Sequence, residues 1–126
     1  VHNTDNYQLD GPQSDLQWEA LMPTHDGLVR LGPQKELFMV SMFHQLKCLD
    51  IIRRDYVQGS MDHSKTTPVA HHCLNYIRQM VLCRGDRRPE WVVDPFAEHS
   101  VQIRRKQTCS DWTKVYERVR ENEDSI

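Results

Sequence analysis

A short sequence repeat constrains the fold of this chain more than any other feature. The hexapeptide Cys-Leu-Asp-Ile-Ile-Arg at residues 48–53 recurs as Cys-Leu-Asn-Tyr-Ile-Arg at residues 73–78. Each copy lies in a segment whose apolar residues follow the spacing of an amphipathic helix. Two helices joined by a loop pack antiparallel, with their equivalent faces opposed. The repeat therefore predicts a pair of helices that share one interface.

When the alignment is extended to residues 44–53 and 69–78, four positions of each segment fall on a single helical face. They are His44, Lys47, Cys48 and Ile51 in the first segment, and Val69, His72, Cys73 and Tyr76 in the second. An unpaired buried polar group costs about 1–3 kcal/mol, so imidazole and ammonium groups are expensive core residues. We therefore expect a pocket at which His44, Lys47 and His72 converge. A structural network of polar residues is the alternative.

Capping residues set the boundaries of three predicted helices. The first runs from residue 34 to about residue 58 and ends at Gly59, because glycine commonly terminates helices. The second covers about residues 68–83, with Thr-Pro at its start. The third covers about residues 111–122 and is capped by Ser110.

The remaining segments are expected to have little regular structure. Residues 1–33 are rich in Asn, Asp, Gln, Gly and Pro, which predicts an extended arm with a short helical turn near residues 15–21. A short edge strand is predicted at residues 28–31, and the alternation around residues 101–103 is compatible with another. We expect a mainly α domain at residues 34–126, with long loops and disulfides.

Length and charge exclude several classes of protein. The 126 residues suit one domain. The net charge of -2 argues against a nucleic-acid partner, since binding to phosphates requires a basic excess. No apolar stretch approaches the length of about 20 residues that crosses a bilayer. Basic residues at 87–88 and 104–106 are interpreted as solvated loops.

The cysteines indicate cross-links. There are four of them, at Cys48, Cys73, Cys83 and Cys109, and no Cys-x-x-Cys motif favours a zinc ribbon or a thioredoxin-type redox site. Disulfides would stabilise a small core in an oxidising compartment. We therefore expect two disulfides, with all three pairings open. Four buried thiols in a cytosolic protein are the alternative.

Three linked motifs follow one another along the chain. They are Phe-His-Gln-Leu-x-Cys-Leu at residues 43–49, His-Cys-Leu-Asn-Tyr-Ile-Arg-Gln at residues 72–79 and Cys-Ser-Asp-Trp at residues 109–112, with Trp18 upstream. In this order they resemble the UstYa family of fungal secondary-metabolite proteins. The resemblance covers about residues 18–120.

The resemblance implies a tailoring reaction on a fungal peptide or polyketide: ring closure, hydroxylation, desaturation or halogenation. It also implies an N-terminal membrane anchor and a location in the secretory lumen, which would account for a chain that begins at Val1 and for the even cysteine count. A homodimer or a heterodimer with a family member is compatible with it. Family members carry two His-x-x-His-Cys motifs, whose histidines are thought to bind copper.

This chain departs from the family motif at two positions. Lys47 and Val69 stand where the family has histidine, so that only His44 and His72 remain. Copper oxidase sites usually need three or more ligands. The nearest substitute is His71, which lies about 100° around the helix from His72. A protonated lysine about 4 Å from a divalent ion would repel it by roughly 8 kcal/mol at an effective dielectric near 20.

These departures lead to a hypothesis of metal-independent chemistry. We expect a cyclase or isomerase that acts on a polyketide or peptide intermediate and needs no cofactor. His44, Lys47 and His72 would be its acid–base residues, because burial lowers the pKa of a lysine and histidine titrates near neutrality. Tyr76 and Arg78 would bind the substrate, with the guanidinium holding an enolate or carboxylate oxygen. For Arg78 a surface ion pair is equally compatible with the sequence.

Two other functions stay open. The first is a copper-dependent oxidase or oxidative cyclase, with His44, His72 and His71 as ligands. Histidines in predicted loops are further candidate ligands: His25, His63 and His99. The second is a non-catalytic partner that assembles with a related enzyme.

Overall fold

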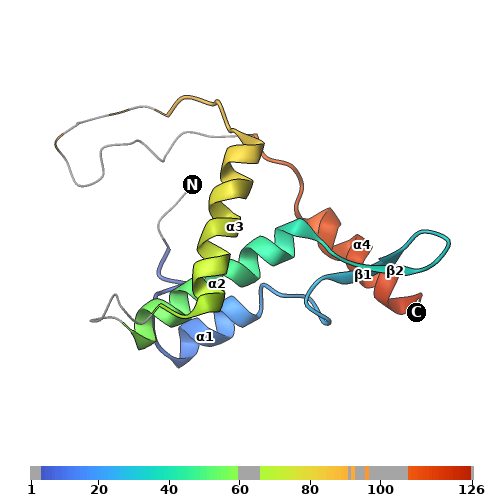
Figure 1. The fold of residues 1–126 in the computed structure, drawn as a ribbon, viewed down its shortest axis with the longest axis horizontal. Helices are drawn as coiled ribbons and strands as arrows, with labels where there is room; N and C mark the ends of the chain where they lie inside the picture. The colour runs from blue at the N-terminus through green and yellow to red at the C-terminus, as the bar shows by residue number, and fades with distance from the viewer. Residues whose placement is uncertain (1–3, 60–65, 91, 93–95, 97–107, 126) are drawn as a thin grey trace.

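The computed structural model describes residues 4–59, 66–90, 92, 96 and 108–125. These residues form a small, mainly helical fold with one antiparallel hairpin (Figure 1). Its elements, in chain order, are α1 (Pro12–Glu19), β1 (Leu28–Leu31), β2 (Glu36–Met39), α2 (Ser41–Gln58), α3 (Pro68–Arg84) and α4 (Thr113–Asp124). The predicted fold class is confirmed.

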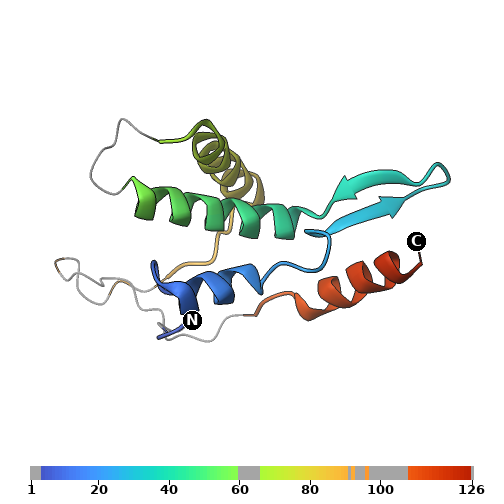
Figure 2. The ribbon, with the colours of Figure 1, turned by 90° about the horizontal axis from the view of Figure 1, so that it is seen from below.

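The helical pair that the repeat predicted is formed by α2 and α3, which pack on each other. The expected antiparallel arrangement was wrong, because the two helices cross steeply in Figures 1 and 2. A disulfide joins Cys48 of α2 to Cys73 of α3, and both side chains are buried. The bond connects equivalent positions of the two copies. Cys83 and Cys109 are exposed, and neither is disulfide-bonded, so the expectation of a second disulfide was wrong.

Helix α3 begins and ends where its sequence predicted. The hydroxyl of Thr67 accepts a hydrogen bond of 3.2 Å from the backbone N–H of Ala70, and Pro68 occupies the first turn. Gly85 follows the last helical residue in the left-handed region, with a φ of 50°. Local capping chemistry therefore sets both ends of this helix.

The predicted start of the first long helix was wrong, because residues 36–39 form strand β2 and α2 begins only at Ser41. The reversal before β2 uses left-handed backbone at Gly32 and Lys35, with φ values of 78° and 54°. It pairs β2 with the predicted strand β1, so that Phe38 lies opposite Val29. A short apolar run fits a helix and a strand equally well, and here pairing with β1 decides between them.

The hairpin and α4 enclose the hydrophobic core. Val29, Phe43 and Val119 are its buried members, contributed by β1, α2 and α4. Figure 2 shows α4 running alongside the hairpin. The side-chain amide of Asn122 accepts a 2.9 Å hydrogen bond from the backbone N–H of Arg30 and donates a 3.0 Å bond to its carbonyl. The backbone N–H and carbonyl of Arg30 in β1 are thereby hydrogen-bonded to α4.

Gly27 permits a close approach between the start of the hairpin and α2. Its φ is 76°, and a Cβ built on it would lie 2.5 Å from Cδ2 of Phe43. No side chain fits in that space, and left-handed backbone also favours glycine. The turn at this residue thus also packs against the core.

The predicted cap of the last helix was also wrong. We expected Ser110, but α4 starts at Thr113 and its N-cap residue is Trp112, which makes no side-chain capping bond. The carboxylate of Asp111, one residue earlier, accepts the backbone N–H of Thr113 at 3.1 Å. Asp and Ser have similar capping strength, so the sequence does not separate neighbouring candidates. The strand considered at residues 101–103 lies outside the described residues.

The N-terminal segment is attached to α2 through a buried guanidinium. It contains the eight-residue helix α1, which starts earlier than the predicted turn. Arg53 donates hydrogen bonds to Asp15, to the carbonyl of Leu9 and to Asp50, at 2.7, 2.7 and 2.9 Å. Its side chain is only 5% exposed, and these acceptors offset the cost of burying its charge.

Among the helices of the described ranges, none combines the length and apolarity that a bilayer span requires.

Candidate functional site

Two imidazoles and a phenol meet at the interface of α2 and α3. The ring of His44, in the first turn of α2, stacks on that of Tyr76 with centres 3.9 Å apart and planes 24° apart. The His72 ring is nearly parallel to that of His44, with centres 6.5 Å apart. Since His72 and Tyr76 are four residues apart, they lie on one face of α3. The structure thus brings together His44 and His72, as the repeat predicted.

The disulfide fixes the position of this aromatic group. Cys48 follows His44 by one helical turn, and Cys73 directly follows His72. The Cα atoms of the two cysteines are only 4.8 Å apart. Because the helical backbone is stiff over one turn, residues within one turn of this crosslink, such as His44 and His72, are held close to each other.

The environment of His44 favours its neutral form. Burial lowers the pKa of this imidazole below its usual value, and the neighbouring His72 and Lys47 lower it further. A neutral imidazole carries a lone pair that can accept a proton or bind a metal ion. The imidazole of His44 is therefore unprotonated near neutral pH and able to accept a proton.

The structure places Lys47 in an ion pair instead of within the ring stack. Its Nζ lies 2.5 Å from Oδ2 of Asp26, in the turn before β1, and both side chains are about half exposed. The ammonium is thus held by a carboxylate and by water. The sequence did not identify Asp26 as a partner, because its only local signal is a turn motif with Gly27.

Two other predicted site residues lie away from the stacked rings. Arg78 is exposed and follows Tyr76 by two residues, which places it about 200° around α3. His71 is also exposed, and its Nε2 lies 3.4 Å from Nδ2 of Asn75. The structure does not bring either side chain to the interface of α2 and α3.

The donor set of the described residues does not fit a complete copper site. Copper oxidase sites usually have three or more ligands, whereas the interface offers two imidazoles with the Tyr76 ring stacked on one of them. Within the described ranges, no cluster of three or more His, Cys, Asp or Glu side chains is close enough to hold one ion. We therefore derive no catalytic step through copper.

Of the three histidines that the sequence placed in loops, the structure describes His25. Nδ1 of His25 lies 3.5 Å from Oε1 of Glu123 in α4, so it is engaged on the hairpin side of the molecule. His63 and His99 lie outside the described residues.

A comparison with protein-family profiles identifies the family of this chain. The profile described as "Mycotoxin biosynthesis protein UstYa" matches residues 11–122, most of the chain. The chain belongs to the UstYa family. The resemblance inferred from the three motifs is thereby confirmed.

Curated members of the UstYa family provide more distant matches. The chain is 29% identical over 102 residues to the UstYa family oxidase phomYb of Diaporthe leptostromiformis, covering 68% of this chain and 40% of that protein. It is also 29% identical over 100 residues to the oxidase ustYa of Aspergillus flavus, covering 77% of this chain and 46% of that one. The chain thus spans less than half the length of these relatives. No solved structure matches it significantly.

The names of these relatives correct the leading functional hypothesis. A third match, phomYd of Diaporthe leptostromiformis, is also named a UstYa family oxidase; it is 29% identical over 59% of this chain and 26% of its own length. The expectation of a cyclase or isomerase was therefore wrong, whereas the expectation that no metal is needed is not tested by these names and stays a prediction. That expectation rested on Lys47 and Val69 at two motif positions, and the chain matches relatives named oxidases despite these two replacements. The comparisons support the alternative of an oxidase.

Proposed function

We propose that this chain is part of an oxidase that tailors a peptide or polyketide intermediate in fungal secondary-metabolite biosynthesis. The relatives named oxidases support this reaction class. The observation that supports its location is the stack of His44 on Tyr76 beside His72, where three reactive side chains from two helices adjoin one another.

The proposed task of His44 is proton transfer. An oxidase removes electrons and protons from its substrate and passes the electrons to dioxygen, so its site must accept protons. A general base must be unprotonated at the working pH before it can accept a proton. Burial and neighbouring cationic groups keep His44 neutral, which suits it to this task. Tyr76 would hold the imidazole plane, and His72 would be its partner across the interface.

We further propose that the protein works in the lumen of the secretory pathway. The Cys48–Cys73 disulfide supports this, since such bonds persist in oxidising compartments and are rare in the cytosol.

Lys47 is not proposed as an acid–base residue, because its ammonium is paired with the carboxylate of Asp26. We therefore assign this pair a structural role.

Gene replacement in the native fungus tests the proposal. Deletion should lead to a metabolite that retains two hydrogens or lacks one oxygen relative to the final product, detected by accurate-mass spectrometry. The wild-type gene should restore the product, and His44→Gln should not, because loss of a general base typically lowers rates about 10²- to 10⁴-fold. His71→Gln is the matched control, since His71 lies on the same helix pair and outside the stack.

The same substitutions separate the competing functions when the purified full-length protein is used. Oxygen uptake should accompany turnover, and the assay is run both with chelator and with added Cu²⁺. If His44→Gln and His71→Gln have equal effects, the stacked rings are not the site. If a related protein must be added and His44→Gln then loses nothing, this chain is a non-catalytic partner.

A further inference from the structure

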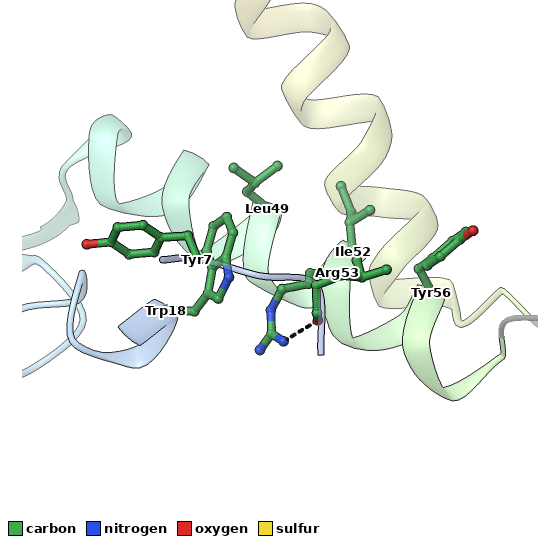
Figure 3. A pocket seen from close by; sticks show the side chains of 7 residues that line it. Tyr7, Trp18, Leu49, Ile52, Arg53 and Tyr56 are labelled. Atoms are coloured by element: carbon green, nitrogen blue, oxygen red, sulfur yellow. Dashed lines mark hydrogen bonds between the residues drawn. The ribbon is translucent and has the colours of Figure 1, made fainter. Parts of the chain in front are cut away.

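A separate hollow lies between α2 and the N-terminal segment. Figure 3 shows the side chains that line it. Its cavity volume is about 480 Å³. This is within the range of small-molecule sites, about 300–1,000 Å³. Its walls are Tyr7, Leu9, Trp18, Leu49, Ile52 and Tyr56, with Arg53 at its base.

The nitrogen donors at the base of this hollow already have partners. Arg53 is bonded to Asp15, Asp50 and the carbonyl of Leu9. The indole N–H of Trp18 donates to the carbonyl of Gln8 at 3.1 Å. A polar ligand would therefore lose hydrogen bonds with water and gain few from these groups, which disfavours its binding.

The aromatic walls favour a flat apolar group. The Tyr7 and Trp18 rings meet edge to face with centres 5.6 Å apart, and Cζ of Arg53 lies 5.7 Å from the Trp18 ring centre. In Figure 3 the hydroxyls of Tyr7 and Tyr56 point away from the hollow at its two ends. Ring faces and aliphatic side chains thus line the interior, and such surfaces bind aromatic rings by stacking and by burial of apolar area.

We propose that this hollow is a binding pocket for a flat, apolar ring of the substrate. That its ligand is the substrate rests on the proposed function, whereas the preference for a ring follows from the pocket itself. Leu49 and Tyr56 follow His44 by five and twelve residues, which corresponds to about 7–18 Å along α2. They also lie about 120–140° around the helix from His44, so the hollow and the stacked rings are on different faces of α2. A substrate with its ring here must therefore curve around α2 to bring its reacting atoms to His44.

Nuclear magnetic resonance titration of the ¹⁵N-labelled full chain tests this pocket directly. The probe is indole, and the control is the polar N-acetylglycinamide. The resonance of the Trp18 indole N–H, identified by its absence in Trp18→Phe, should shift saturably with indole and remain unchanged with the control. Equal shifts with both compounds, or none with indole, would overturn the proposal.

Two variants link the shift to this pocket. Tyr56→Ala removes one wall at a half-exposed position that folding tolerates, and should weaken indole binding by about three- to tenfold, the effect of one aromatic contact. Ile52→Trp should fill the pocket and abolish binding. Leu74→Trp on α3 is the matched control and should bind indole as wild type does, since Leu74 is 58% exposed and does not line the pocket. Unchanged affinity in Tyr56→Ala would contradict the pocket even if Ile52→Trp did not fold.

Binding can also be separated from oxidation. His44→Gln should bind indole with unchanged affinity, because His44 does not line the pocket. A fungus that oxidises its metabolite normally with Ile52→Trp in place would overturn the assignment to the substrate and leave the oxidase proposal intact. Indole binding by a protein that oxidises nothing would support the ring preference and contradict the proposed function.

Discussion

Cys48 and Cys73 occupy the same position in two copies of one sequence motif, and their sulfur atoms are bonded across the interface of α2 and α3. Their Cα atoms are 4.8 Å apart. Because His44 precedes the first cysteine by one turn and His72 directly precedes the second, this bond also determines how closely the two imidazoles approach. Stability and site geometry therefore depend on the same crosslink.

Removal of this disulfide should destabilise the protein. It closes a loop of 25 residues, for which the chain-entropy estimate is about 3.5 kcal/mol. We expect the double variant Cys48→Ser/Cys73→Ser to lose about that much unfolding free energy in urea denaturation. Cys83→Ser/Cys109→Ser is the control, and its midpoint should change little because both side chains are exposed. A larger loss in the control would contradict the assigned crosslink.

The stability of the protein should decrease in mild acid through His44. Burial, followed by the charges of His72 and Lys47, lowers the pKa of His44 below 6.5 in the folded state. The unfolded chain then binds the proton more tightly, so the unfolding free energy falls as the pH drops through about 6.5 toward the folded pKa, and is unaffected above that range. His44→Gln should remove this part of the decline.

Thermal melts in chelator-containing buffer from about pH 7.5 to pH 5 measure this effect, since the range spans the ordinary histidine pKa. His71→Gln, an exposed position on α3, should keep the wild-type decline. If His44→Gln keeps it as well, the imidazole is not the group responsible.

Replacement of Lys47 should change the titration of His44 more than the stability of the fold. The ammonium lowers the pKa of His44, so Lys47→Met should raise it, which can be measured from the ring C–H resonances. Its ion pair with Asp26 is about half exposed, and such pairs contribute about 0–1 kcal/mol. A lower His44 pKa in Lys47→Met would contradict this arrangement.

Loss of the Arg53 guanidinium should detach the N-terminal segment. Arg53→Met would leave Asp15, Asp50 and the Leu9 carbonyl without their common donor. Removal of one partner from a buried pair typically costs about 3–5 kcal/mol, and we expect about 2–3 here because the carboxylates are more exposed than Arg53. Arg54→Met is the control, since its side chain is 44% exposed and should change stability by less than about 1 kcal/mol. Equal losses would show that Arg53 is not the attachment point.

Gly27→Ala should destabilise the hairpin and the core together. The new methyl would lie 2.5 Å from Cδ2 of Phe43, on left-handed backbone. Overpacking of this kind costs about 1–3 kcal/mol, which chemical denaturation can measure. Gly32→Ala tests the backbone contribution alone, because Gly32 also has positive φ but no atom within 4 Å of the added carbon. The loss at Gly27 should exceed the loss at Gly32.

The sequence predicted features that depend on nearby residues. Thr67-Pro68 and Gly85 delimit α3 because capping involves groups within one turn of the helix end. The same local signals did not distinguish β2 from an extension of α2, since residues 36–39 suit both conformations and their partner strand lies in another part of the chain. They also did not identify Asp26 as the partner of Lys47, because an ion pair across 21 residues has no local pattern.

The repeat by itself determined that two similar helices carry His44 and His72 on equivalent faces, because helical periodicity fixes which residues share a face. Only the tertiary structure decided which cysteines pair, that Tyr76 stacks on His44, and that Arg53 is buried beneath an aromatic hollow. These contacts join residues far apart in the chain, and their formation depends on packing against elements whose positions no local sequence pattern specifies.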